Sequence, residues 1–444
     1  MKPQLLVRTA LGLCTAALIA GCNQATTVPT AQADRPDYVM SVTATPQDTP
    51  QSLEARYGGR VVELNAEAGF AILGLDAGAA KARNLRAQAL GDGPVAEPNI
   101  DQFQAGGIAF MGGARSMWAG GARSMWAGGA RSMWAGGARS MWAGGTYSLV
   151  PENTVPFKQI LLEKAHALAP GLGAGVKVAV IDTGIDLAHP AFIDSLAPAT
   201  EWKDYVGNDA LPQEEGVLGV GGHGHGTAVA GIVLQVAPLA TILPIRVLDS
   251  DGAGDTDHVA SAIYYAVEKG ARVINLSLGS VTKSDVIEQA VKYATEKKNV
   301  LVVSSAGNDN AKTITFPAQH ASDGADGERS LSVGSVNALD LKSSFSNYQK
   351  DRLELMAPGE NIFTAGPDGL LVSWSGTSMA APIAAGGLAL ALGQTLAVPL
   401  KDVTKKMAEN GQDLYNNGMN SAYKDMLGKG RLDLVRFLTN TIKY

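Results

Sequence analysis

Apolar runs of strand length alternate with helix-length amphipathic segments through residues 147–444. Continuous apolar runs of this kind are typical of strands buried on both faces of a parallel sheet. Four of them predict such strands: residues 176–181, 241–248, 273–276 and 300–303. Because helical segments fall between these strands, the pattern predicts an α/β domain with a doubly wound, mostly parallel sheet. The functional site of such a domain lies at the carboxyl ends of the strands.

Polar residues predict where the intervening helices begin. Asp255 or Thr256 precedes a segment with one apolar face that ends at Gly270. Ser284 precedes a second segment of the same kind. Residues 379–393 are largely apolar but contain one proline and two adjacent glycines near their middle, which favours a buried helix over a membrane span.

A smaller α+β unit is predicted at residues 38–104, ahead of the large domain. It begins with a strand at residues 38–42. Thr49-Pro50 then predicts a helix start, because threonine caps free amides and proline fits the first helical position, and Gly58-Gly59 predicts its end. The remaining predicted elements are strands at residues 60–64 and 69–75 and a helix near residues 79–89.

The first 21 residues predict a signal peptide for export. Lys2 and Arg8 precede a short apolar run, and a spacer over residues 22–37 follows. Residues 18–22, LIAGC, resemble the bacterial lipoprotein cleavage box, so Cys22 is expected to carry a lipid that anchors the chain to a membrane. The alternative is an ordinary signal peptide with a cysteine there by chance.

Residues 113–144 are four perfect copies of the octapeptide GARSMWAG and hold four of the six tryptophans. The paired glycines oppose a helix, so we predict a linker over residues 105–146. Each copy also carries one arginine, and no acidic residue occurs between Gln102 and Pro151. Contact with an anionic membrane or wall polymer is the alternative to a plain spacer.

Composition and charge exclude several classes of protein. With 46% hydrophobic and 18% charged residues, the chain is not generally disordered. A net charge of -6 gives no electrostatic reason to bind nucleic acid. The two cysteines, Cys14 and Cys22, both lie at the N-terminus, so no disulfide framework holds the predicted domains.

Two polar side chains at element ends suit a catalytic acid–base pair. Asp182 follows the first buried strand, where a carboxylate is held rigidly enough to orient an imidazole, although such residues are often simple turn formers. His225 stands between two glycines at the start of an apolar helix, where it is accessible as a general base. His223 is its rival, but we expect it to be solvated in the glycine-rich loop at residues 219–224.

A hydroxyl and an amide complete the candidate chemistry. Ser378 begins the long apolar helix, where the positive helix end favours a developing anion, although a serine at that place is often only a cap. Asn308 follows the strand at residues 300–303. Its side-chain amide is placed to donate to a tetrahedral oxyanion, as is the backbone amide of Ser378.

Asp182, His225 and Ser378, in this order and with Asn308 before the serine, resemble the subtilisin-like serine peptidases. The resemblance covers about residues 157–438 and is carried by the blocks VAVIDTG, HGTAVAG and GTSMAAP. It implies a subtilisin-like fold in which Asp182 orients His225 and His225 acts as the base. Ser378 then attacks the peptide carbonyl to form an acyl-enzyme, and Asn308 helps to form the oxyanion hole.

The resemblance also implies the substrate-binding residues and the partners. Ser277, Leu278 and Gly279 would pair as a strand with the substrate backbone. With Ser305, Ala306 and Gly307 they would wall the pocket for the side chain before the cut. Residues 38–104 resemble the family's inhibitory propeptide, a small ferredoxin-like domain. The implied partners are therefore protein or peptide substrates and the chain's own propeptide.

No cofactor is expected. The segment after His225 passes from Gly231 to Pro238 without room for the loop that holds a tight calcium site in many relatives. Acidic clusters elsewhere offer at most a weak calcium site, and solvated loops are the simpler expectation for them. Their members are Asp204, Asp209, Glu214, Glu215, Asp249, Asp251 and Asp255.

The sequence therefore predicts an exported serine endopeptidase made as a lipid-anchored zymogen. Self-cleavage between about Gln104 and Tyr147 would free residues 147–444 from the anchor. The rival prediction is a non-catalytic surface-binding scaffold that uses the Trp/Arg repeats. A serine esterase or lipase is disfavoured because Ser378 lacks the Gly-x-Ser-x-Gly elbow.

Overall fold

The computed structural model describes residues 35–90, 93–99, 101–105, 150–217, 220–322 and 328–443. The predicted signal peptide, Cys22 and the octapeptide repeats lie outside these ranges. Within them, no helix combines the length and the apolar character that crossing a bilayer requires.

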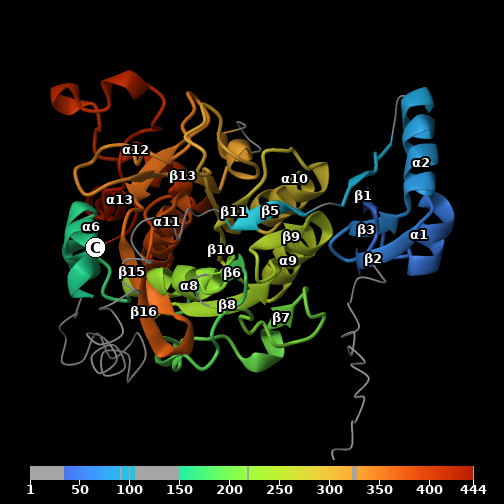
Figure 1. The fold of residues 1–444 in the computed structure, drawn as a ribbon, viewed down its shortest axis with the longest axis horizontal. Helices are drawn as coiled ribbons and strands as arrows, with labels where there is room; N and C mark the ends of the chain where they lie inside the picture. The colour runs from blue at the N-terminus through green and yellow to red at the C-terminus, as the bar shows by residue number, and fades with distance from the viewer. Residues whose placement is uncertain are drawn as a thin grey trace, which may run out of the picture. The chain divides into compact units, whose positions relative to one another are not determined.

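A seven-stranded sheet forms the centre of the large domain (Figure 1). Every neighbouring pair of strands in it is parallel. The strands, in spatial order, are β14 (Leu355–Pro358), β13 (Ser330–Val336), β12 (Leu301–Ser305), β10 (Val273–Leu276), β6 (Lys177–Asp182), β8 (Thr241–Arg246) and β7 (Lys203–Asp204). The predicted parallel α/β sheet is confirmed. Three strands that the apolar pattern did not single out, β7, β13 and β14, extend the sheet at both edges.

Alternate residues of the central strand β6 face two separate cores, as the two-residue period of a strand requires. Val178 and Val180 pack with α8 (His225–Val236) and α11 (Thr377–Leu392). Ala179 and Ile181 pack with α9 (Thr256–Glu268) and α10 (Asp285–Lys292) on the other face. The sheet is therefore covered by helices on both sides.

The helix predictions are largely confirmed, and one capping prediction is wrong. The Ser284 hydroxyl caps α10 by accepting a hydrogen bond from the Ile287 amide. Helix α11 is buried along its whole length despite Pro382. Asp255 does precede α9, but its side chain makes no capping hydrogen bond to that helix, and the Thr256 hydroxyl is buried without a hydrogen-bond partner.

Shorter helices and a hairpin complete the domain. The helices are α6 (Thr154–Gln159), α7 (Leu162–Leu168), α12 (Val403–Glu409) and α13 (Leu434–Thr439). The hairpin joins β15 (Ile362–Gly366) and β16 (Leu370–Trp374) in antiparallel register. It packs against α8 and brings Trp374 edge-on to the His225 ring, with 5.3 Å between the ring centroids.

The predicted N-terminal unit is an antiparallel sheet of order β2-β3-β1-β4 with two helices. Its elements are β1 (Tyr38–Thr43), α1 (Pro50–Tyr57), β2 (Arg60–Asn65), β3 (Phe70–Leu75), α2 (Ala77–Leu90) and β4 (Glu97–Pro98). Thr49 and Ser52 form a capping box at α1, as the Thr-Pro start predicts. The order β-α-β-β-α-β is that of the ferredoxin-like fold.

The N-terminal unit packs on α9 and α10. Phe70 of β3 stacks on Tyr264 of α9, with ring centroids 3.3 Å apart. The Glu97 carboxylate accepts hydrogen bonds from the Asp285 amide at 2.8 Å and from the Ser284 hydroxyl at the start of α10. Asn99 likewise accepts a hydrogen bond from the Asp257 amide in the first turn of α9.

Strand β5 (Asp101–Ala105) follows this unit and lies between two strands of the large domain. It pairs antiparallel with β9 (Ala253–Asp255) on one side and with β11 (Leu278–Gly279) on the other. In the β11 register Gln104 faces Gly279 and Ala105 faces Leu278. The strand therefore continues into residue 105, where we predicted the linker to begin.

Candidate active site

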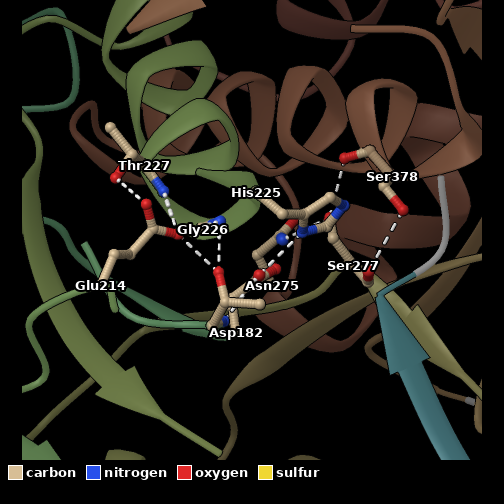
Figure 2. A network of polar contacts seen from close by, with 9 residues as sticks. Asp182, Glu214, His225, Gly226, Thr227, Asn275, Ser277 and Ser378 are labelled. Carbon is tan, nitrogen blue, oxygen red and sulfur yellow. Dashed lines mark hydrogen bonds and ion pairs between the residues drawn. The ribbon is translucent and has the colours of Figure 1, made fainter. Parts of the chain in front are cut away.

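Asp182, His225 and Ser378 are brought together at the carboxyl edge of the sheet (Figure 2). Asp182 is the last residue of β6, His225 opens α8, and Ser378 is the second residue of α11. These three elements are separated in the sequence, but α8 and α11 pack against each other and against β6. All three side chains are at most 1% exposed.

The His225 ring is held from its Nδ1 side. Nδ1 lies 2.7 Å from Oδ1 of Asp182, and the same carboxylate oxygen accepts the Thr183 amide at 2.8 Å. Nε2 of His225, on the other side of the ring, is buried without a hydrogen-bond partner. The arrangement leaves one imidazole nitrogen for proton transfer.

The Ser378 hydroxyl is tied to Ser277. It donates to the Ser277 carbonyl at 3.1 Å, while the Ser277 hydroxyl donates back to the Ser378 carbonyl at 2.8 Å. Asn275 of β10 donates in turn to the Ser277 hydroxyl at 2.9 Å. This reciprocal pair joins the start of α11 to the residue that precedes β11.

Asn308 is oriented by Thr377, the residue before Ser378. Its Oδ1 accepts the Thr377 amide at 2.8 Å and the Thr377 hydroxyl at 3.1 Å. Its Nδ2 is buried and has no hydrogen-bond partner. Leaving a buried amide donor unsatisfied costs free energy, so a site that keeps one in place is suited to an incoming oxygen atom.

The predicted substrate-binding residues form two segments. Leu278 and Gly279 make up β11, and Ser277 precedes it. Ser305 ends β12, and Ala306 and Gly307 follow it. β11 is the strand that β5 pairs with, so this edge accepts an extended chain through main-chain hydrogen bonds.

Thr315 fills the space between these two segments. A Cβ atom placed on Gly279 would lie 2.5 Å from the Thr315 hydroxyl oxygen, and one on Gly307 would lie 2.7 Å from its methyl carbon. The Thr315 hydroxyl donates to the Ser305 carbonyl at 3.2 Å. Thr315 carries no local signal in the sequence, because the two glycines that it packs against lie on other segments of the chain.

Two expectations about solvated groups are wrong. His223 is buried, with its Cβ packed against Gly216. Among the acidic residues, Asp204, Glu214 and Asp255 are also buried. Asp204 is paired with Arg246 at 3.0 Å, and burial raises the pKa of Asp204. A polar sequence marks such a loop as exposed, whereas the Asp204 carboxylate is hydrogen-bonded to Arg246 at the end of β8 and the Glu214 carboxylate to Thr183 and the first turn of α8.

One group of side chains in the described ranges has the spacing of metal ligands. The ligand atoms of Asp255, Asp257 and His258, at the start of α9, all lie within 4.8 Å of one another. The group belongs to the start of α9, whereas α8 runs without interruption from His225 to Val236.

The sequence model of the Subtilase family matches residues 173–423. The chain belongs to this family, and it is a serine endopeptidase. It is 36% identical to thermitase of Thermoactinomyces vulgaris over 267 residues, which cover 57% of this chain and 88% of thermitase. It is 38% identical to subtilisin BL of Lederbergia lenta over 227 residues, which cover 49% of this chain and 76% of subtilisin BL. Subtilisin DY of Bacillus licheniformis is 34% identical to it over 275 residues, which cover 59% of this chain and 93% of subtilisin DY.

Proposed function

We propose that Asp182, His225 and Ser378 are the catalytic triad of this endopeptidase and that Asn308 forms part of its oxyanion hole. The main support is the 2.7 Å contact of Asp182 with His225, together with two buried nitrogens that have no hydrogen-bond partner, His225 Nε2 and Asn308 Nδ2. These are the two atoms that would meet the attacking hydroxyl proton and the developing oxyanion.

The reaction follows from these positions. Ser378 releases its hydrogen bond to Ser277, transfers its proton to His225 Nε2 and attacks the peptide carbonyl. Asp182 holds the ring orientation and stabilises the imidazolium. Asn308 Nδ2 and the Ser378 amide, one of the first amides of α11 and so without an intrahelical acceptor, donate to the oxyanion. His225 then protonates the leaving amine, and water repeats the sequence on the acyl-enzyme.

We further propose that residues 38–104 act as an inhibitory propeptide. Phe70, Glu97 and Asn99 supply the contacts to α9 and α10 described above. β5 lies beside β11 as a substrate chain would, and its register runs toward Ser277, the partner of Ser378. These contacts support cleavage of the chain shortly after Ala105.

We also propose where the precursor and the processed enzyme are located. Cys22 would hold the precursor on a membrane through a lipid, and self-cleavage within residues 105–146 would release residues 147–444 to the extracellular space. The test is expression of the full chain beside Ser378→Ala and Cys22→Ala copies. Membrane and medium fractions are then followed by intact mass spectrometry.

We expect the parent to yield a lipid-bearing N-terminal fragment in the membrane and an active domain in the medium. The Ser378→Ala copy should remain a full-length membrane protein, and the Cys22→Ala copy should lose the lipid mass. An active, unprocessed membrane enzyme beginning at Cys22 would contradict the release. An inert but folded parent would favour the scaffold alternative.

A further inference from the structure

Glu214 lies in the loop between β7 and α8, with its carboxylate enclosed by the residues that follow two members of the proposed triad. It is 5% exposed. Oε1 accepts hydrogen bonds from the Thr183 hydroxyl at 2.5 Å and from the Gly226 amide at 3.1 Å. Oε2 accepts the Thr227 hydroxyl at 2.7 Å (Figure 2).

These contacts supply a cap that α8 lacks locally. The amides in the first turn of a helix have no intrahelical acceptor. The residue before α8 is Gly224, with a φ of 94°, and it has no side chain to cap them. Glu214 reaches in from outside the helix and accepts the Gly226 amide instead.

The end of β6 and the start of α8 are therefore joined twice. One link is the 2.7 Å contact between Asp182 and His225. The other runs one residue further along each segment, from Thr183 through Glu214 to Gly226 and Thr227. Thr183 also accepts the Gly226 amide directly at 2.9 Å. Because two bonded bridges resist rotation better than one, the second fixes the angle at which the imidazole meets its carboxylate.

We propose that Glu214 is a positioning residue of the active site, whose carboxylate clamps Thr183 to the first turn of α8 and so sets the geometry of the Asp182–His225 pair. The inference rests on the triad assignment above. The role of Glu214 is to position other residues and not to contact substrate or the reacting atoms. Replacing Glu214 is therefore expected to change kcat and not KM.

The clamp depends on the charge state of Glu214. Burial raises the pKa of Glu214 to about 7, in spite of the hydrogen bonds from Thr183 and Thr227, and the nearby charge of Asp182 adds to the rise. The other charged or titratable groups around its loop are His225 on α8, His223 against Gly216, and the pair of Glu215 with Arg246. A protonated Glu214 turns one acceptor oxygen into a donor, so the clamp loses the added strength of hydrogen bonds to an ionised carboxylate below about pH 7.

The test compares Glu214→Gln with Glu215→Gln in the mature enzyme. The control removes the same charge from the neighbouring residue, whose side chain is 70% exposed and bonded to Arg246. We expect Glu214→Gln to lower kcat by about 10- to 100-fold with KM unchanged, as a displaced catalytic group does. On the acid side of the pH profile, kcat/KM of the wild type should fall with the binding of two protons. In Glu214→Gln it should fall with the binding of one. Glu215→Gln should match the wild type.

A second pair of variants tests the clamp if Glu214→Gln does not fold. Thr183→Val removes the hydroxyl that Glu214 binds, and Thr183→Ser retains it. We expect Thr183→Val to lower kcat and Thr183→Ser to keep it. Wild-type kcat and a two-proton acid limb in Glu214→Gln, or equal kcat values for Thr183→Val and Thr183→Ser, would overturn the proposal. A fully active Ser378→Ala enzyme would instead overturn the triad on which it rests.

Discussion

The side-chain oxygen of Asn308 accepts the backbone amide of Thr377 at 2.8 Å, and Thr377 is the residue directly before Ser378. This hydrogen bond helps to fix the proposed nucleophile and oxyanion donor relative to each other. The Thr377 hydroxyl strengthens this link, because it donates to Asn308 and accepts the Gly307 amide.

Asn308→Ala should therefore lower kcat with little change in KM. Removing one donor of this kind costs about 10²- to 10³-fold in turnover, a value known from subtilisin. Asn308→Asp keeps the size of the side chain but removes the donor, and it should lose at least as much activity. Steady-state kinetics on a peptide substrate checks both variants. Retained kcat in Asn308→Asp would show that the donor is not used.

Asp182→Asn should lower kcat by about 10⁴-fold, the loss known for the equivalent change in another serine peptidase, because an amide favours the wrong tautomer of His225. KM should change little, since Asp182 is buried behind the ring. Asp186→Asn is the matched control. Its carboxylate also follows β6 but accepts the Ala188 amide instead. A similar kcat for the two variants would argue against an orienting role for Asp182.

Thr315→Gly should widen the choice of residue before the cut. Thr315 stands between Gly279 and Gly307, so its removal clears space for a longer side chain between the two proposed wall segments. We expect kcat/KM for peptides with a large apolar residue before the cut to rise by about 10-fold relative to alanine peptides. A paired-peptide competition assay measures this ratio. An unchanged ratio would place the specificity pocket elsewhere.

Glu354 should make the free energy of unfolding depend on pH, independently of catalysis. Burial raises the pKa of Glu354 to about 8, against smaller opposing effects of the Ser332 amide and Lys429. The folded protein therefore holds one more proton than the unfolded chain between the ordinary glutamate pKa and about pH 8. Stability falls as the pH rises through that window.

Glu354→Gln should accordingly unfold at a higher temperature than the wild type at about pH 8 and at a similar temperature at about pH 4. Glu296→Gln, at an exposed position, is the control and should follow the wild type at both values. Calorimetry of Ser378→Ala versions avoids self-digestion during heating. A Glu354→Gln protein that is no more stable than the wild type at about pH 8 would contradict the raised pKa.

Sequence patterns predicted the parts of the fold that depend on local signals. The buried strands β6, β8, β10 and β12 are continuous apolar runs, and the Thr49 capping box and the Ser284 cap depend on neighbouring residues. The candidate residues Asp182, His225 and Ser378 were recognisable because each stands at an element end inside a distinctive block.

Contacts between distant loops could not be predicted in the same way. Glu214 looks like part of an exposed acidic loop, and only the fold brings it to Thr183 and Gly226. His223 was expected to be solvated for the same reason. Thr315 has no local signal either, since its importance comes from two glycines on other segments.

Labelling the mature enzyme with a serine-directed phosphonate shows whether Ser378 is the nucleophile. The adduct is then mapped by tandem mass spectrometry while casein cleavage is followed in parallel. We expect one adduct, on Ser378, whose formation matches the loss of activity, and no adduct in the Ser378→Ala copy. An adduct on a different serine, or full inhibition without modification of Ser378, would contradict this assignment.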